Sequence, residues 1–244
     1  MKIALVSPYD YAYPGGVVIH IHHLYEEFTK MGHDVRIITP YSGSSASLDS
    51  RDIIPIGRPV PVPSGGSIAR ATLSPMLSSP VRAILEREGF DIIHLHEPLG
   101  STITIATLRV SNTITVGTFH ACHSTTWGYQ IMSPFVTRWF KKLRGKIAVS
   151  KPAMEFISKH FPGEYTIIPN GIDVAHFSPT VPPIERFRDG KLNILFVGRL
   201  EKRKGLSHLL GAYKMVKKEL PNSRLIVVGP GKRRQYEKLS LIHI

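Results

Sequence analysis

The 244-residue chain is 42% hydrophobic, which is enough for one large or two small domains with buried cores, and no run of about 18 apolar residues is present that could span a membrane as a helix. Its single cysteine, Cys122, excludes an internal disulfide framework and predicts a reducing, cytoplasmic location. Lys and Arg outnumber Asp and Glu by 31 to 18, and the resulting net charge of +13 favours anionic partners such as nucleotide phosphates, anionic lipid or nucleic acid.

The N-terminal part of the chain alternates apolar strands with segments of helical periodicity. The run KIALVS (2–7) predicts a buried strand rather than a signal peptide, and DVRIITP (34–40) predicts the next strand. The segments SGSSAS (42–47) and PVPVPSGGS (59–67) are rich in Ser, Pro and Gly, which argues against regular structure. Between the two strands, one apolar stripe predicts a helix that ends near Gly32, formed by Val17, Ile21, Leu24, Phe28 and Met31.

The middle of the chain continues the same alternation. Ser79 and Pro80 are predicted to cap and open a helix whose buried side carries Val81, Ile84 and Leu85. Further strands are expected over 90–96, 113–120, 146–150 and 164–169, with helices between them.

The segment RWFKKLRGK (138–146) interleaves basic and aromatic residues. This pattern is compatible with a nucleic-acid-binding surface, but also with a helix that buries Trp139, Phe140 and Leu143 and exposes its cations to solvent. We prefer the helix and expect no nucleic acid partner.

After a Pro-rich stretch, a second series begins with a strand at 192–198, a helix after Lys204 and a strand at 223–229. Strands that alternate with helices and are rich in Val and Ile predict a parallel sheet covered on both faces. The predicted fold is therefore α/β, with a complete Rossmann-like first domain over 1–175, a linker over 176–190 and an incomplete second Rossmann-like domain over 191–244.

The loop PYDYAYPGGVVIH (8–20) connects the first strand to the first helix. In an open α/β sheet, ligands bind beyond the carboxyl ends of the strands, where such loops lie. Gly15 and Gly16 allow the backbone to approach a ligand, although an ordinary tight turn would use the same pair. The dinucleotide-binding G-x-G-x-x-G and the P-loop motif are both absent from the sequence.

Seven of the twelve histidines occur in three groups along the chain. On a helix, His20 and His23 share a face while His22 points elsewhere, and no Asp or Cys completes a ligand set, so we expect no metal there. The sequence HACH (120–123) has no second ligand pair either. His94 and His96 alternate on a strand and should face the same way as hydrogen-bonded packing residues. His120, at the carboxyl end of a strand beside the glycine loop, is the histidine to which we assign a function.

Four cations surround the predicted start of the helix after residue 204: Arg199, Lys202, Arg203 and Lys204. A helix N-terminus already carries about half a positive charge, so cations there are mildly unfavourable. They are either solvated charges balanced by Glu201, or they form a site for an anion.

Seven pieces of the sequence resemble the GT-B glycosyltransferases of family 4, retaining enzymes that use nucleotide-sugar donors, and in particular the bacterial phosphatidylinositol mannosyltransferases. The pieces occur in the family's order between residues 1 and about 231: PYDYAYPGGVVIH, GSIAR (66–70), HLHEP (94–98), GTFHA (117–121), IAVS (147–150), IPNGIDVAHF (168–177) and GRLEKRKG (198–205).

The resemblance implies a role for individual residues. Gly16 matches the glycine whose backbone faces the donor diphosphate, and Arg199 and Lys204 match the pair that binds this diphosphate. His120 matches the active-site histidine that lies against the transferred sugar. The positions that face the acceptor correspond to Tyr9, Ser67 and Arg70.

The implied function is transfer of a hexose, with mannose as the leading candidate, from a nucleotide-diphosphate sugar to an alcohol acceptor such as a lipid or inositol-type head group, without metal or other cofactor. The protein is expected to be cytoplasmic, and peripheral on the cytoplasmic membrane face if the acceptor is a lipid. Two other functions are compatible with the residues: a GT-B sugar-nucleotide epimerase, and a non-catalytic basic module that binds nucleic acid or membrane surfaces.

The sequence departs from the family in two places. The surface helix that these mannosyltransferases use on membranes corresponds to SPVRAILERE (79–88), where Arg82 and Arg87 are balanced by Glu86 and Glu88. The family's Glu-x7-Glu motif would follow the VVGPG loop (227–231), but the chain continues to an unrelated KLSLIHI and lacks it. We therefore expect a C-terminally truncated chain that is itself inactive.

Overall fold

The computed structural model describes residues 1–43, 51–64, 67–120 and 127–237. The chain divides into two compact units, Met1–Gly171 (unit 1) and Ile172–Ile244 (unit 2), and each is considered by itself. Cys122 and His123 lie outside the described residues.

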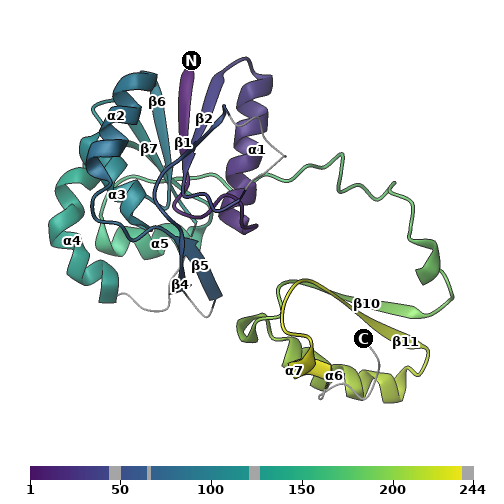
Figure 1. Ribbon diagram of the computed structural model, residues 1–244. Coiled ribbons are helices and arrows are strands. Elements are labelled where there is room, and N and C mark those ends of the chain that lie inside the picture. Colours follow the sequence, from purple (N-terminus) through teal and green to yellow (C-terminus); the bar gives the residue numbers. More distant parts are fainter. Residues whose placement is uncertain (44–50, 65–66, 121–126, 238–244) are drawn as a thin grey trace. The chain divides into compact units, whose positions relative to one another are not determined.

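Unit 1 is built on a seven-stranded sheet with the order β3-β2-β1-β6-β7-β8-β9, in which every pair of neighbours is parallel (Figure 1). The chain adds strands on one side of β1 and then crosses to the other side at β6, so a topological switch point lies between β1 and β6. The strands are β1 (Lys2–Val6), β2 (Asp34–Thr39), β3 (Ile53–Pro55), β6 (Ile92–His96), β7 (Ile114–Phe119), β8 (Leu143–Ala148) and β9 (Thr166–Ile167).

Helices cover both faces of this sheet, as the parallel pairing requires. Helix α1 (Gly16–Lys30) packs Ile21 and partly buried neighbours on the β1 and β2 residues Ile3, Leu5, Val35 and Ile37. The other face forms the larger core, which includes Val81, Ile103, Phe140 and Ile157 from four helices. These are α2 (Ser78–Glu88), α3 (Thr102–Val110), α4 (Trp127–Phe140) and α5 (Lys151–His160).

One predicted irregular segment is in fact regular. Strands β4 (Val60–Ser64) and β5 (Ser67–Ala71) form a separate two-stranded antiparallel sheet, so the prediction that PVPVPSGGS has no regular structure is wrong. Proline is compatible with an edge strand when its missing N–H faces away from the partner strand. Pro61 and Pro63 alternate along β4, so their missing N–H groups lie on the same edge of the strand, and the two residues stand opposite Arg70 and Ile68 of β5.

Two helix boundaries also differ from the prediction. Helix α2 begins at Ser78 with Leu77 as its N-cap, so Ser79 is not the cap and Pro80 lies within the first turn, where its missing N–H would have no partner anyway. Helix α4 ends at Phe140, and Leu143 begins β8. Phe140 and Leu143 are nevertheless buried, one from the helix and one from the strand, and Trp139 is partly buried against the same core.

Unit 2 contains a two-stranded parallel sheet and one long helix. Leu200, Leu206, Leu210 and Tyr236 form its core against one face of the sheet. On the other face Leu195 and Val197 are 61% and 70% exposed. The elements are η1 (Glu185–Phe187), β10 (Leu192–Val197), η2 (Lys202–Lys204), α6 (Leu206–Glu219), β11 (Ser223–Val228) and α7 (Arg234–Glu237).

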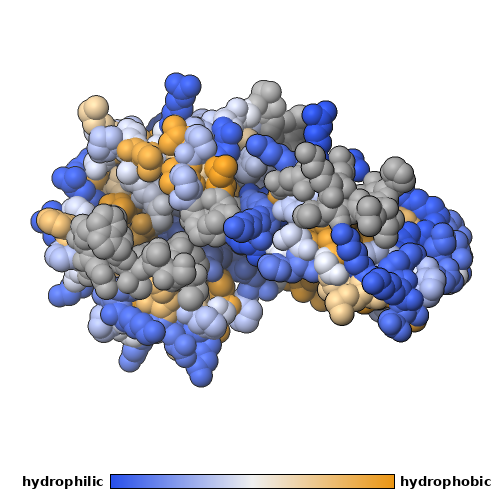
Figure 2. Space-filling view, turned by 90° about the horizontal axis from the view of Figure 1, so that it is seen from below, coloured by the Kyte–Doolittle hydropathy of each residue, from blue (hydrophilic) through white to orange (hydrophobic). Residues whose placement is uncertain are grey.

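Within the described ranges, none of the helices has both the length and the apolar composition needed to cross a membrane. Hydrophilic residues cover most of the described surface that is visible in Figure 2, and apolar residues there occur in small groups.

Candidate active site

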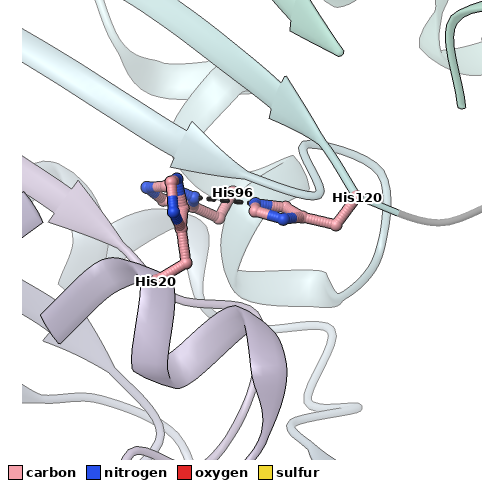
Figure 3. A group of neighbouring side chains, drawn as sticks. All are labelled: His20, His96 and His120. Carbon is pink, nitrogen blue, oxygen red and sulfur yellow. Dashed lines mark hydrogen bonds between the residues drawn. The ribbon is translucent and has the colours of Figure 1, made fainter. Parts of the chain in front are cut away.

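Three histidines converge at the carboxyl edge of the unit 1 sheet, next to the switch point. His20 lies on α1, His96 ends β6 and His120 follows β7, and the three rings point toward one another (Figure 3). Nδ1 of His96 and Nε2 of His120 are hydrogen-bonded at 3.1 Å. The ring centroid of His20 is 5.1 Å from that of His120 and 5.5 Å from that of His96. We call these residues the histidine cluster.

Strand alternation explains why β6 contributes to this cluster. Ile93 and Leu95 point into the larger core, so His94 and His96 lie on the opposite face of the sheet, which α1 covers. The two rings are stacked with centroids 4.4 Å apart, and Nε2 of His94 is hydrogen-bonded to Oγ1 of Thr118 at 2.7 Å. The prediction that both histidines face the same way is confirmed. Hydrogen bonding is incomplete, however, because Nε2 of His96 is buried and has no partner among the described residues.

The histidines of the sheet edge are neutral at physiological pH. Burial, with a smaller contribution from neighbouring histidines, lowers the pKa of His120 to about 3 and that of His94 to about 4. Burial, reinforced by the surrounding imidazoles, also holds the pKa of His96 well below its ordinary value. A neutral His120 can donate or accept a hydrogen bond at pH 7, but it does not provide a positive charge for a phosphate.

The backbone at His120 is held by a residue to which sequence reasoning assigned no role. The buried carboxylate of Glu97 accepts a hydrogen bond from the backbone N–H of His120, and the backbone N–H of Glu97 donates to the carbonyl of Thr118. Glu97 has a φ of 46°, in the left-handed region that a non-glycine residue rarely adopts. Local strain of this kind persists only where the surrounding contacts fix it, and it is common at functional sites.

Gly16 is the first residue of α1, and Gly15 is its extended N-cap. A Cβ atom built on either glycine would meet no atom within 4 Å, so packing within the chain does not require glycine at these positions. The first N–H groups of a helix have no intrahelical partner and attract anions. Gly16 and His20 are thus presented by the same first turns of α1, on the side of the histidine cluster.

The positions predicted to face an acceptor lie on two neighbouring segments. Tyr9 forms an isolated antiparallel bridge with Ala71 at the end of β5, and burial raises the pKa of its hydroxyl above the ordinary value, with a smaller contribution from Glu97. Arg70, on β5, donates from Nε to Oδ2 of Asp10 at 2.9 Å. Ser67 opens β5, and its side chain lies outside the described part of the structure.

The Asp10 carboxylate is fully buried and explains the position of Arg70. It accepts hydrogen bonds from the backbone N–H groups of Ala12 and Ser42 and from the Ser42 hydroxyl, as well as from Arg70. Sequence reasoning did not identify Asp10, which ties the glycine loop to β5. Arg70 is therefore part of an ion pair with a buried acid, and its guanidinium also lies 5.7 Å from the centre of the Tyr13 ring.

In unit 2 the cations lie just before the helix rather than in its first turn. Lys202–Lys204 form the 3₁₀ turn η2, and α6 begins at Leu206 after Gly205, which has a φ of 75°. Glu201 forms ion pairs with Arg199 and Arg203, at 3.3 Å and 3.1 Å. Lys204 is exposed, and its ammonium group forms no ion pair with any described residue. The acid thus balances only part of the cationic segment.

Two family models match the chain. The model of Glycosyltransferase Family 4 matches residues 14–176, and the model of Glycosyl transferases group 1 matches residues 178–243. The phosphatidyl-myo-inositol mannosyltransferase of Mycobacterium leprae is 35% identical over 237 residues, which are 96% of this chain and 62% of the relative. The enzyme of the same name from Propionibacterium freudenreichii is 33% identical over 245 residues, 97% of this chain and 64% of the relative.

Solved structures show the same fold at lower identity. Anabaena HepE in complex with UDP-glucose has a TM-score of 0.65 and 17% identity over 98% of this chain and 64% of its own. Sucrose-phosphate synthase from Thermosynechococcus elongatus has a TM-score of 0.63 and 17% identity over 98% of this chain and 66% of its own. The fold is therefore α/β of the GT-B type, as predicted, and the family model matched by residues 14–176 shows that the chain belongs to glycosyltransferase family 4.

Proposed function

We propose that this chain belongs to a retaining glycosyltransferase that moves a hexose, with mannose as the leading candidate, from a nucleotide-diphosphate sugar to an alcohol on a lipid or inositol-type head group. The observation that carries the proposal is the similarity to phosphatidyl-myo-inositol mannosyltransferases over 96% of the chain. The chain spans about 62% of the length of the M. leprae relative, so the proposal concerns the complete protein that carries this sequence.

His120 is the residue proposed to contact the transferred sugar. Its Nε2 is engaged with His96, which leaves Nδ1 as the ring atom available for a sugar hydroxyl. Because the ring is neutral at pH 7, it acts through hydrogen bonding and shape rather than through charge. Glu97 holds the backbone of His120 and is proposed as a positioning residue.

Charge for the donor diphosphate is proposed to come from other groups. In unit 1 the candidate is the N-terminus of α1 at Gly16, where helix N–H groups and the absence of a Cβ favour an approaching anion. In unit 2 the candidates are Arg199 and Lys204. Cationic contacts of this kind stabilise the negative charge that grows on the leaving nucleoside diphosphate, which lowers the barrier to transfer. Neither a metal nor another cofactor is required by this proposal.

The acceptor is proposed to lie against Tyr9, Ser67 and Arg70. Since Arg70 is already paired with buried Asp10, its remaining guanidinium N–H groups are suited to orient a hydroxyl or phosphate rather than to supply an uncompensated charge. A lipid acceptor would place the protein peripherally on the cytoplasmic face of the membrane. The charges near the end of α2 give this attachment little support, because Glu88 pairs with both Arg87 and Lys2.

The test is a turnover assay of the complete protein with GDP-mannose, UDP-glucose and related donors, each with phosphatidylinositol vesicles or free inositol. We expect transfer from one donor and a product with retained anomeric configuration. An inverted product would exclude the retaining mechanism. Conversion of the donor in the absence of any acceptor would instead identify an epimerase, and salt-sensitive binding without turnover, unaffected by Arg199→Ala, would identify a non-catalytic basic module.

A further inference from the structure

The histidine cluster contains more nitrogen ligands than the proposed transfer uses. One ring nitrogen from each of His20, His96 and His120 lies within 4.8 Å of the other two. Only His120 has a part in the proposed chemistry. In the part of the chain that the structure describes, this is the one group of three or more His, Cys, Asp or Glu side chains with such spacing.

We propose that the histidine cluster binds a divalent ion of the zinc class through three imidazole nitrogens and leaves a fourth coordination position open. Imidazole is a preferred ligand of Zn²⁺, Cu²⁺ and Ni²⁺, and three histidines with an open fourth position form a known type of zinc site.

The geometry requires only a small adjustment to form this site. Zn–N bonds of about 2.0–2.1 Å in a tetrahedron place two ligand nitrogens about 3.3–3.4 Å apart. Nδ1 of His96 and Nε2 of His120 are already 3.1 Å apart, and both residues are fixed at the ends of paired strands. His20 is half-buried on α1, so rotation of its side chain toward the pair would complete the set.

The hydrogen bonding of His96 is compatible with coordination through Nδ1. Its ring is completely buried, yet one nitrogen shares a single hydrogen bond with His120 and the other has no partner among the described residues. Coordination through Nδ1 would replace only this one hydrogen bond of the His96 ring, and Nε2 would keep its present surroundings. The Glu97 carboxylate, bound to the backbone N–H of His120, would partly balance the charge of a bound cation.

The consequence for activity rests on the proposed function. An ion on Nε2 of His120 would fix Nδ1 as a hydrogen-bond donor and place a positive charge beside the ring assigned to the transferred sugar, so we expect Zn²⁺ to inhibit transfer. The metal is thus an inhibitory ligand, which is consistent with a reaction that itself needs no metal.

Binding is tested on the chain itself, without any donor. Chelator-treated protein is titrated with Zn²⁺ in competition with a metallochromic indicator, and Co²⁺ is added separately to record the visible absorption of a tetrahedral site. His20→Gln and His120→Ala remove one ligand each. The matched controls are His22→Gln and His23→Gln on the same helix, and Cys122→Ser separates thiol from imidazole binding. Circular dichroism verifies that every variant is folded.

We expect one tightly bound Zn²⁺ per chain. Loss of an outer-shell partner alone changes metal affinity by roughly 10–100-fold, so loss of a ligand in His20→Gln or His120→Ala should weaken binding at least tenfold. The three controls should bind as the unmodified chain does. No stoichiometric binding, unchanged binding in both ligand variants, or loss of binding in a control would overturn the proposal.

A separate activity measurement distinguishes this inference from the proposed function. If Zn²⁺ binds as expected but does not inhibit an active complete protein, the metal site stands and the placement of the sugar at His120 is wrong. If Zn²⁺ does not bind while His120→Ala still abolishes transfer, the placement of the sugar at His120 stands and the metal site is wrong.

Discussion

Units 1 and 2 position their candidate groups in different ways. In unit 1 a sheet covered on both faces buries His96 completely and holds His120 through Glu97 and His96. In unit 2 a two-stranded sheet is covered on one face, and the cationic segment around Lys204 is exposed. A hydrogen bond to a reacting sugar depends on geometry within a fraction of an ångström, whereas a charge acts over several ångströms. Unit 1, whose sheet is covered on both faces, therefore carries the group that the proposed function requires to be placed precisely.

The largest expected effect is that of replacing His120. In the complete protein, His120→Ala should lower kcat at least 100-fold, since loss of one positioned hydrogen-bonding group that stabilises the transition state costs about 10²–10³-fold. Binding of the nucleoside diphosphate, measured by calorimetry, should change less than about twofold, because the neutral ring does not bind phosphate through charge. Normal turnover of His120→Ala would remove this residue from the active site.

Replacing Arg199 or Lys204 should have a smaller effect, which is measured on kcat/KM. Arg199→Ala and Lys204→Ala should each lower kcat/KM at least tenfold, because a charge-assisted hydrogen bond contributes about 1.5–3 kcal/mol. Lys202→Ala is the matched control from the same 3₁₀ turn and should change kcat/KM by less than about twofold. Equal losses at all three positions would indicate a diffuse basic surface rather than a specific anion site.

The two units should also differ in local stability. Hydrogen exchange followed by mass spectrometry should show slower exchange in β1 and β6 than in β10 and β11, by at least tenfold, because strands covered on both faces open only with their unit. The exposed Leu195 and Val197 mark the uncovered face of unit 2. Equal protection in the four strands would show that coverage of the sheet does not set their stability.

The elements predicted correctly from the sequence are those that produce a pattern within one short segment. The strands β1, β6 and β7 are apolar runs that any buried parallel strand would produce, and alternation correctly placed His94 and His96 on one face. The hairpin at Pro61 and Pro63 was missed because proline usually signals a break, and its tolerance depends on which side of an edge strand faces the partner.

The histidine cluster could not be predicted in the same way. His20, His96 and His120 belong to separate segments. The predicted sheet placed only His120 beside the glycine loop, and no pattern within one segment shows that the three rings meet. Glu97 was part of a motif that supported the family resemblance, but its left-handed backbone and its bond to His120 leave no trace in a hydrophobic pattern. The pairing of Arg70 with Asp10 was also missed, because 60 residues separate the two and no local pattern connects them.

The smallest expected effect is a dependence of stability on pH that belongs to unit 1. His94 and His120 have folded-state pKa values of about 4 and about 3, below the ordinary value of 6.5. Between each folded-state pKa and pH 6.5, the unfolded chain therefore binds more protons than the folded one. Their contribution to stability is therefore complete above pH 6.5 and is lost as the pH falls toward 4. From pH 6.5 to 5.5 the free energy of unfolding should decrease by about 1 kcal/mol for each such histidine.

Urea denaturation of the chain at pH 7.5, 6.5 and 5.5, with EDTA present to keep metal from the cluster, measures this dependence. His120→Gln removes one titrating group and should reduce the dependence of the free energy of unfolding on pH by the contribution of that group. His23→Gln, on α1 outside the cluster, should leave this dependence unchanged. Carboxylates contribute little in this range because they titrate mainly below about pH 5. A free energy of unfolding that stays constant from pH 7.5 to 5.5 would mean that these histidines are not buried in the neutral form, and the distinction drawn between a hydrogen-bonding unit 1 and a charged unit 2 would then fail.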